Sequence, residues 1–268
     1  RLVISDMDGT LLDGDGNIPS QLWPLLETMK DRDIAFVPAS GRQCTTLSTM
    51  FHSHLQGMPI IAENGTYVVR DGIDISSSLI DPNLAHEVIT GVRQLRDDGH
   101  DVGLVVDTKS MAYLERGDDP FVSHVATYYH SHTVVKDLTE HTDNVIKLSI
   151  YDFDEASDTT HPTMQRIARE HQVILATPNW VDIMNPGVNK GSAVEAVQRD
   201  LGVTAGQTAI FGDFLNDLEM MPLAKWSFAM ANSHPDIIRA SNYVAPPNTD
   251  NGVITVLSAL LGVNVPTI

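Results

Sequence analysis

The segment DMDGT, residues 6–10, places two carboxylates two positions apart, directly after a short apolar run. Residues 2–4 predict a buried strand, so Asp6 and Asp8 leave its carboxyl end, where open α/β sheets bind ligands. Two neighbouring carboxylates repel each other, and a divalent cation bound between them relieves that repulsion. One carboxylate could then act as a nucleophile and the other as an acid/base. Taken alone, such a pair is more often an ordinary acidic turn.

Two further segments carry groups that suit a phosphate. Ser40 and Gly41 follow the apolar run 34–37 and offer a hydroxyl and backbone N–H groups where a helix begins. Ser40 could equally be a simple N-cap. Lys190 begins another predicted helix, where its charge opposes the helix dipole, so structure alone gives no reason for a lysine there. A phosphate in front of the helix would give one.

A fourth segment, GDFLND at residues 212–217, follows the apolar run 208–211. It places Asp213, Asn216 and Asp217 at a junction between a strand and a helix. Asp217 could merely complement the dipole of that helix. Each of the four segments is weak evidence alone. Together they place suitable polar groups at four strand or helix ends in chain order, which indicates one shared site.

Alternating elements must bring these segments together. Apolar runs at 2–4, 34–37, 59–62 and 208–211 are separated by helical patterns, which predicts a parallel α/β core. The part between them reads as α+β, and its alternation at residues 102–106 predicts a half-exposed strand. Apolar residues at helical spacing from Leu47 to Leu55 predict a helix.

The expected domain organisation follows from this change of pattern. Residues 1–79 and 185–268 form the predicted core, and residues 80–184 form an inserted α+β domain. An insert between the halves of an α/β core commonly forms a lid over a cleft. Selectivity for a substrate would then reside in the insert.

The four segments together resemble the motifs of the haloacid dehalogenase (HAD) superfamily, specifically its Cof-type phosphatases with a large α+β cap (subclass IIB, C2-type cap). The resemblance covers the whole chain, and it implies a Rossmann-like parallel-sheet core with an inserted cap. By this similarity Asp6 is the nucleophile that forms an aspartyl-phosphate, and Asp8 is the acid/base. One residue departs from the pattern: Phe214 stands where members often carry Asn, which puts in doubt the polar support around the site.

The resemblance also implies the binding residues. Ser40, with Gly41, and Lys190 would hold the phosphoryl oxygens, and Asn216 would lie near the phosphate. Asp6, the backbone carbonyl of Asp8, and Asp213 would bind Mg²⁺, with Asp217 supporting the metal. The expected activity is Mg²⁺-dependent hydrolysis of small phosphorylated metabolites, such as sugar phosphates. A phosphomutase or phosphotransferase would share every catalytic residue, and a receiver-type phospho-switch is disfavoured by the long insert.

Composition excludes several other classes. The formal net charge of −18 disfavours nucleic acid and anionic lipid as partners, because both would be repelled. A small anionic substrate would need a metal on such a chain. No apolar run is long enough for a membrane span. The single cysteine, Cys44, cannot form an internal disulfide, so we expect a cytoplasmic protein. The sequence indicates no protein partner.

Overall fold

The computed structural model describes residues 1–263, so the last five residues of the predicted core segment, 264–268, lie outside the described part. The chain divides into two compact units. The core unit contains residues 1–41, 47–76 and the described residues from 189 onward. The insert unit contains residues 42–46 and 77–188. Each unit has a sheet of its own.

The core unit is built on an eight-stranded sheet with the order β14-β13-β12-β1-β2-β3-β4-β5. Neighbouring strands from β14 to β3 pair in parallel, and β4 turns antiparallel to β3. This confirms the predicted α/β class. The strands are β1 (Leu2–Asp6), β2 (Ala35–Ala39), β3 (Ile60–Ala62), β4 (Tyr67–Arg70), β5 (Ile73–Ser77), β12 (Thr208–Gly212), β13 (Trp226–Met230) and β14 (Tyr243–Ala245).

Helices cover this sheet with their apolar faces. Val194 and Val197 of α6 pack on Ile4, Val37 and Ile210, all of which are fully buried. The α-helices of this part of the chain are α1 (Leu22–Asp31), α2 (Cys44–Met50), α6 (Lys190–Leu201), α7 (Pro235–Ala240) and α8 (Gly252–Leu261). Short helical turns occur at η4 (Ala205–Gln207), η6 (Met221–Leu223) and η7 (Asn248–Asp250).

The helix predicted to reach Leu55 is shorter in the structure. It ends at Met50 and is followed by turns, in which the His54 N–H donates to the Phe51 carbonyl at 2.8 Å. Leu47 and Phe51 are fully buried, whereas Leu55 is only partly buried. The apolar spacing therefore continues beyond the helix because the following turn also packs on the core.

The insert unit has a six-stranded mixed sheet with the order β10-β11-β9-β6-β7-β8. Neighbouring strands pair antiparallel, except for β7 and β8, which are parallel. The strands are β6 (Val102–Thr108), β7 (Ala112–Leu114), β8 (His132–Val134), β9 (Val145–Asp152), β10 (Gln172–Leu175) and β11 (Trp180–Met184). The helices are α3 (Pro82–Asp97), α4 (Asp119–Tyr128), α5 (Thr160–Ile167) and the turn η3 (Leu138–His141).

The expectation of a half-exposed strand at residues 102–106 is wrong, because all of β6 is buried. Helix α3 contacts β6 and β9, and α3 and α5 contact each other. Phe121 and Val125 of α4 pack with Val105 in a second apolar cluster. Helices therefore cover both faces of this strand. The alternation of residues within the strand cannot reveal that its second face is covered.

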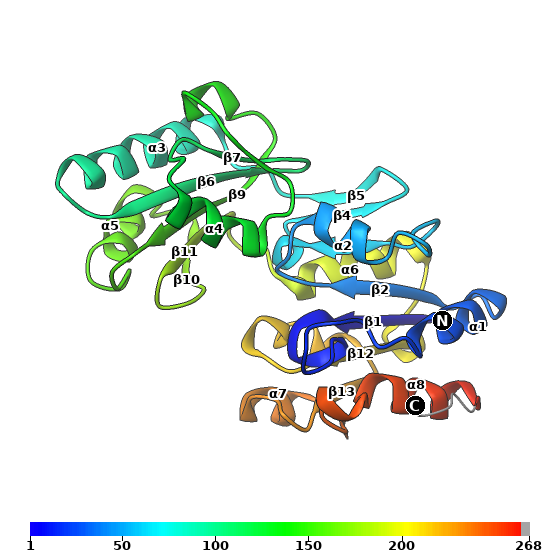
Figure 1. The fold of residues 1–268 in the computed structure, drawn as a ribbon. Helices are drawn as coiled ribbons and strands as arrows, with labels where there is room; N and C mark the ends of the chain where they lie inside the picture. Colours follow the sequence, from blue (N-terminus) through cyan, green and yellow to red (C-terminus); the bar gives the residue numbers. More distant parts are fainter. Residues whose placement is uncertain (264–268) are drawn as a thin grey trace. The chain divides into compact units, whose positions relative to one another are not determined.

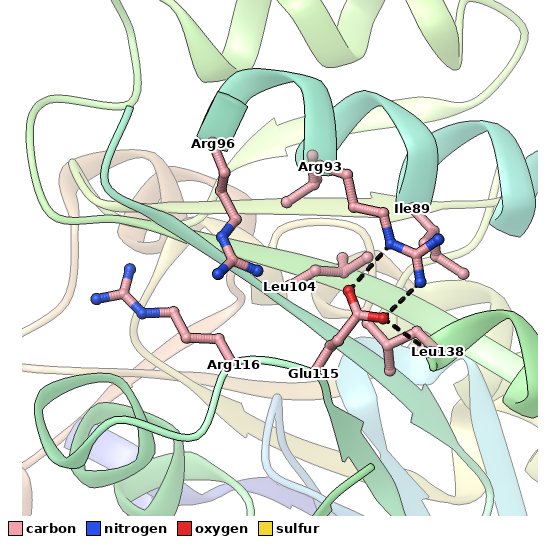
Figure 2. A pocket seen from close by; sticks show the side chains of 8 residues that line it. Ile89, Arg93, Arg96, Leu104, Glu115, Arg116 and Leu138 are labelled. Carbon is pink, nitrogen blue, oxygen red and sulfur yellow. Dashed lines mark hydrogen bonds and ion pairs between the residues drawn. The ribbon is translucent and has the colours of Figure 1, made fainter. Parts of the chain in front are cut away.

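An ion-pair cluster fastens α3 to the segments after β7 (Figure 2). Arg93 Nε donates to Glu115 Oε2 at 3.0 Å, and Arg93 Nη2 donates to Glu115 Oε1 and, at 2.7 Å, to Asp137 Oδ1. These contacts, above all the hydrogen bond from Arg93, hold the pKa of Glu115 below its usual range. The cavity between the side chains encloses about 10 Å³, space for roughly one water molecule. The cluster therefore serves packing rather than metabolite binding.

Replacing Arg93 by Met should lower the free energy of unfolding by about 0.5–1 kcal/mol at about pH 7, because the pair with Glu115 is partly exposed. The pKa of Glu115 is lowered in the folded state. Its contribution is therefore present above its ordinary pKa and is lost as the pH falls through the folded value. Urea unfolding at about pH 7 and about pH 3 should show the difference from the wild type shrinking at the lower pH.

Arg96→Met is the matched control. Arg96 lines the same cavity but forms no ion pair with the residues that the structure describes. We expect a loss below about 0.3 kcal/mol for this variant. An equal loss for both variants, or a loss from Arg93→Met that does not change with pH, would contradict the assigned role of the ion pair.

Candidate active site

The sheet order brings three of the predicted segments to one edge of the core unit. Strand β1 lies between β12 and β2, and all three run parallel. Asp6 ends β1, Ser40 follows β2, and Asp213 follows β12. The chain proceeds from β1 to β2 on one side and returns to β12 on the other, so Asp6 stands at a switch point of the sheet. Switch points are where open α/β sheets bind ligands.

The turn after Asp6 joins the first segment, residues 6–10, to the fourth segment, residues 212–217. The turn η1 (Met7–Leu11) contains Gly9 at φ 79°. A side chain at Gly9 would collide with the carboxylate of Asp213, so only glycine allows this approach. Thr10 Oγ1 donates to Asp213 Oδ1 at 2.7 Å. Thr10 was not among the residues predicted to form the site, although its place within DMDGT was an available signal.

Lys190 connects the third segment to the same place. It is the first residue of α6 and is completely buried. Its Nζ forms ion pairs with Asp6 Oδ1 and, at 2.7 Å, with Asp217 Oδ1. The helix is capped separately, because the Asn189 side chain accepts the Ser192 N–H at 2.9 Å. Lys190 therefore has an electrostatic function at the site and does not cap the helix.

Asp217 supports the loop that carries Asp213. Its Oδ2 accepts the backbone N–H of Asp213 at 2.9 Å and that of Phe214 at 3.2 Å. The turn η5 (Leu215–Asp217) places this carboxylate against Gly212, where a Cβ would lie 2.7 Å from Asp217 Oδ2. The Phe214 side chain is 57% exposed. Since the backbone makes these contacts, replacing the family's Asn by Phe214 does not remove them.

The site carries more negative than positive charge. Burial, and then the charge of Asp217, raise the pKa of Asp6 well above its ordinary value, although Lys190 acts in the opposite direction. Burial also raises the pKa of Asp213. Burial disfavours the charged form of Lys190, but Asp217 and Asp6 outweigh it and raise the pKa of this ammonium. One cation thus faces three carboxylates.

These carboxylates could hold a metal ion. Asp6, Asp213 and Asp217 each offer an oxygen, and these oxygens all lie within 4.8 Å of one another. Hard oxygen ligands suit Mg²⁺ or Ca²⁺ rather than a soft metal. Burial is the main cause of the raised pKa of Asp6, and a bound cation would offset the second cause, the negative charge of Asp217. The donor set and the charge balance therefore both fit a divalent cation.

Ser40, Gly41 and Asn216 meet around Asn64. The Ser40 carbonyl accepts the Asn64 N–H at 2.9 Å, and Ser40 is buried. Asn216 Nδ2 donates to Asn64 Oδ1 at 3.0 Å. A Cβ at Gly41 would lie 3.1 Å from Asn64 Nδ2. Asn64 belongs to none of the four segments, yet it contacts both the loop after β2 and the loop after β12.

Asp8 lies outside the carboxylate cluster. Its side chain is exposed, and the three grouped carboxylates are those of Asp6, Asp213 and Asp217. The predicted acid/base function of Asp8, and the predicted metal contact of its backbone carbonyl, stay predictions. An exposed carboxyl group at this edge can still exchange protons with a ligand and with water.

Comparison with known proteins identifies the class. A family model for haloacid dehalogenase-like hydrolases matches residues 3–257. The 5-amino-6-(5-phospho-D-ribitylamino)uracil phosphatase YbjI of Escherichia coli is 28% identical over 97% of this chain and 96% of its own. The HMP-PP phosphatase of Cronobacter sakazakii is 26% identical over 89% and 86%. The structure of the HAD subclass IIB sugar phosphatase BT4131 aligns with a TM-score of 0.76, at 20% identity over 97% and 98%.

The chain therefore belongs to the haloacid dehalogenase-like hydrolases, and it is a phosphatase of that family. The likeness to BT4131 extends over both units and confirms the fold expected from the resemblance. Within residues 1–263, no helix combines the length and the apolar character needed to cross a membrane.

Proposed function

We propose that this protein is a Mg²⁺-dependent phosphatase that hydrolyses small phosphorylated metabolites through an aspartyl-phosphate on Asp6. The observation that carries the proposal is the buried Asp6 at the switch point, paired with Lys190 and grouped with Asp213 and Asp217. A buried carboxylate with a raised pKa beside two further carboxylates is costly to the fold, and such groups concentrate at functional sites.

The proposed reaction has two displacements. A carboxylate oxygen of Asp6 attacks phosphorus, the bond from phosphorus to the leaving oxygen breaks, and Asp8 donates a proton to that oxygen. Asp8 then accepts a proton from water, whose oxygen attacks phosphorus and releases inorganic phosphate and Asp6. Lys190 and Ser40, with the N–H groups at Gly41, hold the phosphoryl oxygens, and Asn216 lies near the phosphate.

Mg²⁺ is the ion that we assign to the carboxylate cluster. Asp6, the backbone carbonyl of Asp8 and Asp213 would hold it, and Asp217 would support them. The ion supplies positive charge where a phosphate and a carboxylate must approach each other. Lys190 supplies part of that charge from the protein itself.

We assign substrate selection to the inserted domain, residues 80–184. None of the four segments lies in this range. The curated relatives include phosphatases named for 5-amino-6-(5-phospho-D-ribitylamino)uracil and for HMP-PP. The fold is shared with a sugar phosphatase. A panel of these compounds and of sugar phosphates is the direct test, with released phosphate and organic product measured together. Transfer to a second hydroxyl without free phosphate would indicate a phosphotransferase or phosphomutase instead.

Mg²⁺ should restore activity to metal-stripped protein, and Ca²⁺ should inhibit it. Mg²⁺ prefers a compact octahedron with ligands at about 2.0–2.1 Å, which leaves one oxygen of Asp6 available. Ca²⁺ accepts six to eight ligands at about 2.3–2.6 Å and can bind both oxygens of a carboxylate, which would occupy the attacking atom. A steady-state assay with Ca²⁺ titrated against Mg²⁺ measures this.

The thermal midpoint is a second readout, which measures metal binding independently of activity. Either ion should raise the thermal midpoint of the wild type, because it relieves repulsion among Asp6, Asp213 and Asp217. Asp213→Asn should lose most of that shift. Full activity in chelator, equal turnover with Ca²⁺ alone, or an unchanged shift in Asp213→Asn would contradict the assigned metal site.

A further inference from the structure

Asn64 lies outside the four segments and has an unusual backbone. It belongs to the turn η2 (Glu63–Gly65) after β3, where Glu63 has φ 50° and Asn64 has φ 55°. Two successive non-glycine residues in the left-handed region are disfavoured, and Asn tolerates that region far better than Glu does. Contacts with the surrounding structure stabilise such a turn against its backbone strain, and turns of this kind cluster at functional sites.

The contacts of Asn64 join two loops of the site. Its N–H donates to the Ser40 carbonyl at 2.9 Å, while its Oδ1 accepts from Asn216 Nδ2 at 3.0 Å. Its amide also faces Gly41, where a side chain would be within 3.4 Å of all three terminal atoms of Asn64. The left-handed turn therefore aims one amide at both the loop after β2 and the loop after β12.

The contact with Asn216 determines how that residue is presented. The Asn216 side chain is exposed, so without a partner it would sample several rotamers. An amide nitrogen carries two hydrogens. One is donated to Asn64 Oδ1, which orients the amide and leaves the second hydrogen for a ligand.

We propose that Asn64 is a positioning residue whose side chain orients Asn216 toward the phosphoryl group. The inference rests on the proposed phosphatase function. Small errors in the placement of such groups reduce rates strongly, and we expect loss of the Asn64 side chain to lower kcat/KM by about ten- to a hundredfold.

The test separates the side chain from the backbone. Asn64→Gly removes Oδ1 but keeps a residue that adopts a positive φ without cost. Asn251→Gly is the matched control, because Asn251 has φ 53° in the same unit but does not belong to the site. We expect near wild-type thermal midpoints for both variants, reduced kcat/KM for Asn64→Gly, and unchanged kcat/KM for Asn251→Gly.

A double-mutant cycle decides whether Asn64 acts through Asn216. In an Asn216→Ala background, Asn64→Gly should lower kcat/KM by less than about threefold, because its target has gone. Inhibition by inorganic phosphate should weaken to a similar extent in Asn64→Gly and in Asn216→Ala. If the two substitutions lowered kcat/KM fully and independently in the double variant, this inference would be overturned but the proposed function would stand. Normal activity of Asn64→Gly beside an active wild type would have the same meaning. A wild type that releases no phosphate from any compound of the panel would overturn the proposed function and this inference with it.

Discussion

Replacing Asp6 by Asn should abolish phosphate release while leaving the protein folded. Asn has nearly the same shape as Asp but lacks the carboxylate that attacks phosphorus, so we expect turnover to fall by roughly four orders of magnitude or more. Lys190 keeps its ion pair with Asp217 at 2.7 Å, and the buried repulsion between Asp6 and Asp217 disappears. Phosphate release and the thermal midpoint, both measured with saturating Mg²⁺, check this expectation.

Two companion variants sharpen that test. Asp15→Asn changes an exposed carboxylate a few residues further along the chain and should keep wild-type activity. Asp8→Asn should let phosphate accumulate on Asp6 when the leaving group is good, because attack proceeds without protonation while hydrolysis lacks its base. Wild-type turnover in Asp6→Asn, or no phosphate adduct on Asp6 by mass spectrometry of Asp8→Asn, would refute this division of functions.

Replacing Lys190 by Met should both inactivate and destabilise the protein. Lys190 is completely buried and pairs with Asp6 and Asp217. Breaking a buried ion pair from one side leaves uncompensated charge and costs about 3–5 kcal/mol. We expect that loss in the free energy of unfolding at about pH 8 in chelator, together with loss of phosphate release in Mg²⁺.

The destabilisation should depend on pH in a direction that burial dictates. The pKa of Asp6 is raised in the folded protein, so the folded state binds its proton more readily than the unfolded state does. The contribution of Asp6 to stability therefore increases as the pH falls, and the deficit of Lys190→Met should be smaller at about pH 5 than at about pH 8. Adding Asp217→Asn should restore part of the stability, since it removes one of the unpaired carboxylates, but should not restore activity.

Lys30→Met is the control for this prediction. Lys30 is exposed near the end of α1, and its replacement should change stability by less than about 0.5 kcal/mol. If Lys190→Met unfolds no more easily than Lys30→Met at about pH 8, Lys190 does not neutralise the buried carboxylates as the contacts indicate.

Local patterns in the sequence were sufficient for the class of fold and for most candidate residues. The apolar run before Asp6 and the one before Asp213 each predict a buried strand, and β1 and β12 confirm both. The helix predicted to begin at Lys190 is confirmed by α6 (Lys190–Leu201). These predictions succeed because a strand or helix end depends on neighbours within a few residues.

Patterns that also depend on distant packing were harder to interpret. The spacing from Leu47 to Leu55 continues past the end of α2, because a turn can bury the same face. The alternation in β6 did not reveal that α4 covers its second face. Strands β13 and β14 were not predicted at all, although they extend the parallel sheet beyond β12.

The sequence by itself determined which chemical groups are available: the carboxylates of Asp6, Asp8, Asp213 and Asp217, the ammonium of Lys190 and the Ser40 hydroxyl. Only the tertiary structure decided which of them meet. Lys190 lies 184 residues from Asp6 and 27 from Asp217, yet it pairs with both. Likewise, Asn216 donates to Asn64 across 152 residues. Such contacts arise because parallel strands align their carboxyl ends at one edge, and the order of strands in the sheet is set by long-range packing rather than by local spacing.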